Sequence, residues 1–155
     1  MSIEEARNLA AWSRAVRESS LKRLHRVPEG RESWRPIAEA MSFADLARHL
    51  IDADEWLITK LEIRALEPMV GCAGIAGEVT RAGYLALLSR LEETGRQRAE
   101  LIEELSSEQL AEPIFDRRFG GEVTLWWVIV RGNLDHEVHH RGQLATYLRL
   151  AGIAG

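Results

Sequence analysis

The sequence predicts an all-α protein with the architecture of a four-helix bundle. Four segments place apolar residues three or four positions apart, which is the spacing of one helical face, and connections of unequal length separate them. No segment alternates convincingly as a strand does, and no internal repeat competes with a bundle. The length of 155 residues suits one domain with a buried core, so we expect a single helical-bundle domain over residues 1–155.

The first predicted helix begins near the N-terminus and runs to about His25. Ser2 and Glu5 have the spacing of a capping box, in which two side chains satisfy the free backbone groups at a helix start. Residues 26–41 contain two prolines and a glycine and show no clean period. We therefore expect a long surface connection there, with Trp34 packing down onto the bundle.

The second predicted helix starts at Ser42 and reaches about Arg64. Asp45 follows Ser42 at the third helical position, which again indicates a helix start. A histidine falls in the middle of the apolar stripe of this helix. The stripe consists of Leu46, His49, Ala53, Trp56 and Lys60.

Residues 67–78 break the helical pattern with a proline and three glycines, and this segment either lines a pocket or only turns the chain. The helical period returns over residues 79–105, the third predicted helix, with charged residues on its other side. Residues 106–112 predict one further helical turn. Residues 113–124, with two adjacent glycines, predict either a short hairpin or an irregular loop before the last helix.

The last predicted helix runs from Leu125 to about Ala151, with Thr124 as its N-cap and Gly152 as its end. His136 and His140 lie four positions apart in it, so their imidazoles lie one above the other on one face. One metal ion can take a nitrogen from each at this spacing. No His, Cys, Asp or Glu follows, so a third ligand must come from upstream.

The opposite face of the last helix is also apolar. On a wheel of about 100° per residue, Trp127, Leu134 and Val138 lie opposite His136. A helix that is apolar on two faces is either central to its bundle or covered on its back by a partner. A homodimer is therefore a reasonable prediction.

The histidines have two interpretations. They are either core residues with no ligand role or the donors of a metal site. Burying two imidazoles on an apolar face costs free energy unless their nitrogens are satisfied, and a metal ion satisfies one nitrogen on each. His49 sits in the apolar stripe of another helix, as a third ligand would. These observations favour a metal site made of His49, His136 and His140.

Residues 136–140, HEVHH, also match the HExxH motif of zinc proteases, in which the glutamate is a general base. That hypothesis makes Glu137 catalytic. It is disfavoured because proteases of this kind take a third ligand from further along the chain. Glu137 also lies about 100° around the helix from His136, so we expect it on the surface or behind the ligands.

Two segments carry a resemblance to a known family. Residues 136–152, HEVHHRGQLATYLRLAG, resemble the C-terminal helix signature of the DinB/YfiT-like superfamily of proposed metalloenzymes, and residues 41–57, MSFADLARHLIDADEWL, resemble its histidine-bearing second helix. The resemblance implies an up-down-down-up order of helices and a three-histidine site at His49, His136 and His140. Similar proteins usually hold zinc or nickel. Some of them activate a low-molecular-weight thiol, such as mycothiol, bacillithiol or glutathione, for transfer or isomerisation.

The predicted function follows from the donors. Three neutral imidazoles leave the full charge of a divalent ion and at least one open position, so a bound water or thiol loses its proton near neutral pH. We expect a metal-dependent enzyme that activates a low-molecular-weight thiol or water for transfer or hydrolysis of a small-molecule substrate. The alternative is a non-enzymatic bundle whose metal site is structural or empty, but the sequence offers no fourth ligand for a closed site.

Four neighbours of the histidines carry weaker predictions. Asp52, one turn beyond His49, is either the acceptor of its second ring N–H or an exposed carboxylate. Gln143 and Tyr147 share the ligand face and could orient substrate, although Tyr147 is equally expected in the core. Trp56 either walls the pocket or simply packs.

Composition limits the partners. The net charge is −4, and the 20 basic residues are scattered rather than clustered, so we expect no nucleic-acid partner. No apolar run approaches the ~20 residues that cross a bilayer, and the N-terminus is acidic where a signal peptide is basic. We expect no membrane partner and a cytoplasmic protein. The single cysteine, Cys72, cannot form an internal disulfide, which fits a reducing compartment.

Overall fold

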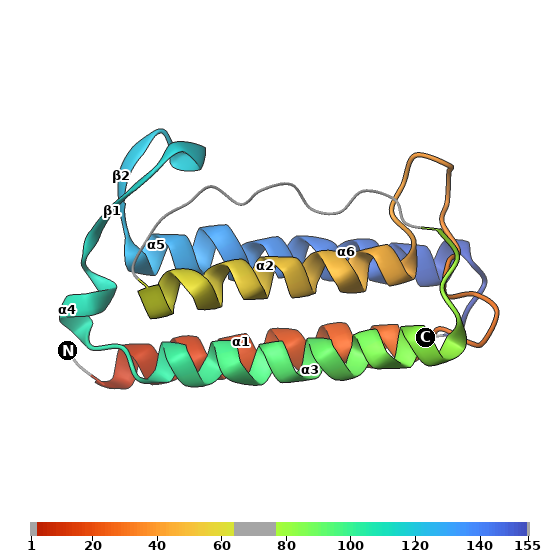
Figure 1. Ribbon diagram of the computed structural model, residues 1–155, viewed down its shortest axis with the longest axis horizontal. Coiled ribbons are helices and arrows are strands. Elements are labelled where there is room, and N and C mark those ends of the chain that lie inside the picture. The colour runs from red at the N-terminus through yellow and green to blue at the C-terminus, as the bar shows by residue number, and fades with distance from the viewer. Residues whose placement is uncertain (1–2, 64–76, 155) are drawn as a thin grey trace.

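The computed structural model describes residues 3–63 and 77–154 and has an all-α bundle with one small hairpin. The long helices are α1 (Ile3–Leu24), α2 (Phe43–Ile63), α3 (Arg81–Glu103) and α6 (Asp135–Leu150). Helices α1 and α6 run in one direction and α2 and α3 in the other (Figure 1), which is the expected up-down-down-up order. Helix α1 packs along α3 and α6, and α2 packs along α3 and contacts α6.

The start of α2 follows the predicted side-chain chemistry. The Asp45 N–H donates to Ser42 Oγ over 3.1 Å, and the Ser42 N–H donates to Asp45 Oδ2 over 2.9 Å. This reciprocal pair fixes the start of α2. The predicted capping box at Ser2 lies outside the described residues, as do Cys72 and most of the segment 67–78.

A hairpin stands before the last helix and projects from one end of the bundle (Figure 1). A short helix, α4 (Ser107–Leu110), leads into it. Strand β1 (Pro113–Asp116) pairs antiparallel with β2 (Gly121–Thr124) around a 3₁₀ turn, Arg117–Phe119. Of the two interpretations of this segment, the hairpin is correct. Gly120 has a φ of +78°, which suits the residue that closes such a turn.

The sequence predicted one regular last helix, but the structure interrupts it. It begins as α5 (Leu125–Ile129), widens into a π-helical segment, Val130–Leu134, and continues as α6. Thr124 Oγ1 accepts the Trp127 N–H over 3.1 Å, as expected of an N-cap. Past the last turn of α6, Gly152 has a φ of +71°, which ends the helix in the left-handed conformation that glycine favours. The predicted ends of this helix are therefore correct, and the π-helical segment is new.

The second apolar face of the last helix is largely covered inside this chain. Leu134 is fully buried in an apolar cluster that includes side chains of α1, and Val138, in α6, is half-buried. Trp127 stays 39% exposed. The last helix is thus central to the bundle. The second apolar face no longer supports a homodimer, which stays a prediction. Within the described ranges, no helix combines the length and the apolar character needed to cross a bilayer.

The core has two apolar halves with a buried polar layer between them. One half gathers side chains such as Phe43, Tyr84 and Tyr147, and the other gathers Leu57 and Ile102. Side chains from all four long helices and the π-helical segment make the layer between the halves. This buried polar layer consists of Ser13, Arg17, Asp54, Thr94, Arg98, Asn133 and Glu137.

Candidate metal centre

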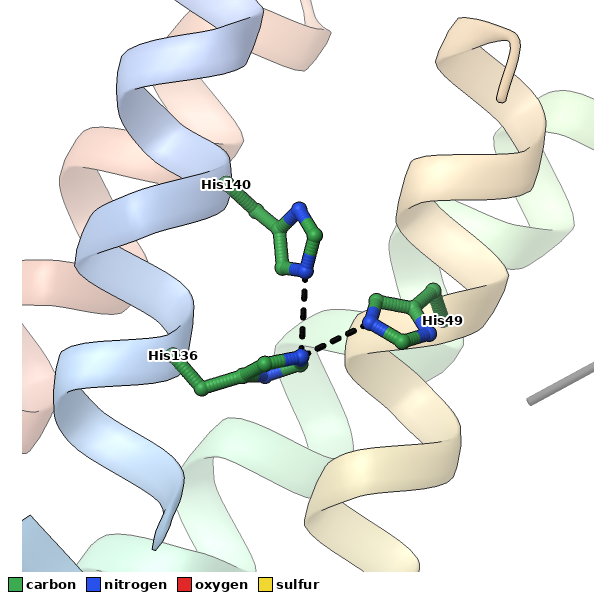
Figure 2. Close-up of side chains that lie close together, drawn as sticks. All are labelled: His49, His136 and His140. Atoms are coloured by element: carbon green, nitrogen blue, oxygen red, sulfur yellow. Dashed lines mark hydrogen bonds between the residues drawn. The ribbon is translucent and has the colours of Figure 1, made fainter. Parts of the chain in front are cut away.

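The structure brings His49 of α2 together with His136 and His140 of α6 (Figure 2). The Nε2 atom of His136 lies 2.7 Å from Nε2 of His49 and 3.0 Å from Nε2 of His140. One ring nitrogen from each of the three histidines lies within 4.8 Å of the corresponding nitrogens of the other two. The donors come from two helices, α2 and α6, and 87 positions separate His49 from His136 because α3 and the hairpin lie between these helices in the chain.

The three imidazoles are neutral near pH 7. Burial lowers the pKa of His136 to about 3, and repulsion from the neighbouring histidines adds to this effect. Burial also lowers the pKa of His140 to about 4 and that of His49 below its usual value. A neutral imidazole keeps a lone pair on one nitrogen, and this lone pair is what a metal ion binds.

Hydrogen bonding among the rings cannot satisfy all three nitrogens. Nε2 of a neutral imidazole is either one donor or one acceptor, yet Nε2 of His136 faces two partners. A divalent cation would take the lone pairs of all three Nε2 atoms at once, so the donor set fits a metal ion better than it fits a packed core.

Gln143 fixes the tautomer of one ring. Its Oε1 atom lies 2.5 Å from Nδ1 of His140, so the Nδ1–H of His140 donates to the amide oxygen and the lone pair stays on Nε2. A contact of this kind orients a metal-binding histidine and raises its basicity. The sequence placed Gln143 on the ligand face but did not predict this contact.

The other three predicted neighbours lie in different surroundings. Asp52 is half-buried and raises the pKa of His49 by its charge, but it makes no hydrogen bond to Nδ1 of His49. Tyr147 packs against Trp34, at 5.8 Å between ring centroids, and belongs to the core, which was one of its two interpretations. The same contact confirms that Trp34 packs onto the bundle. The ring of Trp56 lies under the guanidinium of Arg118, 4.1 Å away.

Glu137 is neither a general base nor a surface residue. It is 1% exposed, and its carboxylate accepts from Arg17 Nε over 2.8 Å and from Arg98 Nη1 over 2.6 Å. The charges of Arg98 and Arg17 outweigh its burial and lower the pKa of Glu137 to about 2. A carboxylate held ionised by two guanidinium groups has no free lone pair directed at a substrate. Of the two positions that the sequence left open for Glu137, the surface is therefore excluded, and the side chain lies buried.

The buried polar layer balances its charges. Asp54 accepts from Arg17, at 2.7 Å, and from Arg98, at 3.0 Å, so two arginines face two carboxylates. Polar side chains and backbone oxygens take other guanidinium donors, including Ser13 Oγ at 2.8 Å from Arg98 Nε. The sequence did not predict this buried polar layer. Both arginines share helical faces with apolar residues, and that is the one signal that could have revealed them.

The fold and the site together define a helical bundle that carries a candidate metal centre in the seam between its second and last long helices. A sequence profile of the DinB superfamily matches residues 13–144, and this stretch contains all three histidines. The chain therefore belongs to the DinB superfamily.

Solved structures agree with this assignment. A DinB-like protein from Bacillus subtilis is 19% identical, with a TM-score of 0.73 over 96% of this chain and 94% of its own. A DinB-like protein from Bacillus cereus is 17% identical, with a TM-score of 0.66 over 90% of this chain and 87% of its own. The colibactin self-resistance protein ClbS, in complex with double-stranded DNA, is 20% identical, with a TM-score of 0.69 over 96% and 95%. A search of curated proteins finds no match.

The ClbS complex contradicts the expectation that nucleic acid is not a partner. That protein has this fold and is bound to double-stranded DNA. The expectation came from a net charge of −4 and from scattered basic residues. Both quantities describe the whole chain, whereas a nucleic acid meets only one face of a protein, so they are insufficient to exclude such a partner.

Proposed function

We propose that this protein is a metal-dependent enzyme whose divalent cation is held by His49, His136 and His140. The observation that carries the proposal is the convergence of three neutral Nε2 atoms, with Gln143 holding one ring in the tautomer that a metal requires. Zinc or nickel is the proposed ion, because imidazole donors suit both. A low-molecular-weight thiol or water is the proposed group to be activated, for transfer to a small molecule or for hydrolysis.

When bound, the ion would supply positive charge that lowers the pKa of a thiol or water beside it. The chain supports this chemistry in two ways. Its three donors carry no charge, so they do not reduce the charge of the ion. Among the described residues, no fourth His, Cys, Asp or Glu joins the cluster, which favours open positions for water or substrate. Glu137 cannot accept the released proton, since its carboxylate already accepts hydrogen bonds from Arg17 and Arg98.

The test is the metal content of untagged protein purified without chelators. We expect about one equivalent in the wild type and a sharp loss in His49→Ala and in His140→Ala, because three neutral donors are needed to hold the ion. His139→Ala is the matched control, since this exposed imidazole lies next to His140 in sequence but outside the cluster. An empty wild type after incubation with zinc and nickel would refute the proposal.

A structure with metal bound separates the enzyme from the alternative of a structural site. Exchangeable water on the ion supports a reactive centre, whereas four protein ligands would show that the site is closed and structural.

Binding of double-stranded DNA is a second candidate function, favoured by the ClbS complex alone. The measurement is fluorescence anisotropy of a short labelled duplex at low and at physiological salt. Phosphate contacts release counterions, so genuine binding weakens steeply as salt rises. Anisotropy that stays flat at low salt would remove this candidate.

A further inference from the structure

An arginine of the hairpin, Arg118, lies in the seam between α2 and the last helix, the two helices that carry the three histidines. Arg118, in the turn between β1 and β2, places its guanidinium carbon 4.1 Å from the ring centroid of Trp56 on α2. Its Nη2 atom also lies against Gly132 of the π-helical segment, where a Cβ atom would come within 3.2 Å. Arg118 therefore touches both sides of the seam between α2 and the last helix.

This arginine lies on the same side of the two helices as the candidate metal ligands. Gly132 is four residues before His136, and Trp56 is seven residues after His49, so each is near a whole number of turns from its histidine. At about 1.5 Å per residue in α2, Trp56 lies about 10 Å from His49 along the helix axis, and Gly132, in the π-helical segment, lies about one turn before His136. Because α2 and α6 run in opposite directions, going forward from His49 to Trp56 and going back from His136 to Gly132 both lead toward the hairpin end of the bundle (Figure 1).

Asp116 orients the guanidinium and leaves part of it available. Its carboxylate accepts from Nε of Arg118 over 3.0 Å and from Nη2 over 2.6 Å. No hydrogen bond from Nη1 is present among the described residues, and the Arg118 side chain is 31% exposed. The edge formed by Nη1 and the second hydrogen of Nη2 is thus free to donate two parallel hydrogen bonds, which is the pattern that a carboxylate accepts.

We propose that Arg118 recognises a carboxylate on a small molecule whose metal-binding group occupies the histidine site. The inference rests on the proposed function, since it places the other end of the ligand at the metal. Trp56 and Asp116 hold the guanidinium in position, and Gly132 provides the space for it. The substrate class is accordingly a short carboxylic acid with its reacting group several bonds from the carboxylate.

The test uses the cobalt-loaded protein and two probes of matched size, 3-mercaptopropionate and 3-mercaptopropionamide. Both coordinate cobalt through sulfur, and the near-ultraviolet absorption of the cobalt–thiolate bond reports binding. We expect the carboxylate probe to bind about tenfold more tightly than the amide, because it gains charge-assisted hydrogen bonds. Arg118→Gln should abolish this preference while leaving the cobalt content and the affinity for the amide unchanged.

Two further variants make the result specific. Arg117→Gln removes the neighbouring exposed charge and should keep the preference. Gly132→Ala moves the guanidinium without removing its charge and should reduce the preference in part. Equal affinities in the wild type, or a preference that survives Arg118→Gln, would overturn the inference. A wild type that takes up no cobalt refutes the proposed function itself, and this inference fails with it.

Discussion

Glu137 shows how two adjacent residues take different roles on one helix. His136 faces α2, where the other rings lie, whereas Glu137 faces the buried polar layer and meets two guanidinium groups. The side chains diverge because successive residues are about 100° apart on a helix. A match to the protease motif therefore carries no catalytic meaning here, since its glutamate faces away from the centre.

Replacing Glu137 should destabilise the fold. Glu137→Gln leaves two buried arginines with one carboxylate, and an uncompensated buried charge costs about 3–5 kcal/mol of folding free energy. Urea unfolding of the metal-free protein measures this loss. Glu103→Gln is the matched control, since Glu103 pairs with Arg14 on the surface, where a salt bridge contributes at most about 1 kcal/mol. Similar losses in both variants would contradict the role given to Glu137.

Replacing Gln143 should weaken metal binding with little effect on stability. Gln143→Leu removes the acceptor for Nδ1–H of His140, and the loss of such a partner lowers metal affinity by about 10–100-fold. Gln143→Glu keeps an acceptor at the same position and should retain the affinity. Competition with a chromophoric chelator measures both. If the leucine variant binds metal as tightly as the wild type, the contact does not orient the ring.

Helices α1 and α3 approach closely at Gly95 of α3, which leaves space for the side chain of Arg17 of α1. A Cβ atom at Gly95 would come 2.5 Å from Nη1 and 2.8 Å from Cγ of Arg17. Any larger residue would push Arg17 away from the buried polar layer. This close approach explains a glycine within a long helix, where it is otherwise unfavourable.

Two glycine substitutions should therefore have opposite effects on stability. Gly95→Ala should destabilise the protein by about 1–3 kcal/mol, because the added methyl group displaces Arg17. Gly142→Ala, in α6, meets no atom within 4 Å and should stabilise it by about 0.4–1 kcal/mol through helix propensity. Thermal and urea unfolding measure both. Stabilisation by Gly95→Ala would show that Arg17 has space to move.

The elements differ in how clearly the sequence predicts them. Helical period and capping residues were sufficient for α2 and for the ends of the last helix, because these signals are local. The π-helical segment was not predicted, since Val130–Leu134 fits a regular helix equally well. The contacts of Arg118 and Arg98 were also missed. Trp56 and Gly132, which Arg118 contacts, and the carboxylates that bind Arg98 come from distant parts of the chain, and sequence spacing contains no information on such partners.

At the scale of the whole molecule, buried titratable groups make the metal-free protein sensitive to acid. The pKa values of His136, His140 and Glu137 are lower in the folded chain than in an unfolded one. The unfolded chain therefore binds more protons as the pH falls below 6.5, the ordinary pKa of histidine. Stability should decrease as the pH falls from about 7 toward about 2, and these groups should leave it constant above about pH 8.

Urea midpoints of the metal-free protein between pH 8 and pH 4 test this dependence. His136→Gln does not titrate at that position, so its stability should decline less steeply between pH 6.5 and pH 4. A midpoint that rises on acidification, or identical slopes for the variant and the wild type, would contradict the assignment of a depressed histidine pKa.

The buried polar layer also determines how the four helices align along their length. Purely apolar faces can slide past one another by one turn, about 5.4 Å, and still bury similar area. In this bundle such a slip would separate Arg98 from Asp54 and Glu137 and leave each charge alone in an apolar half. The buried polar layer therefore disfavours any pairing of the helices that is shifted along their axes. It keeps His49 level with His136, at some expense in stability compared with an all-apolar core.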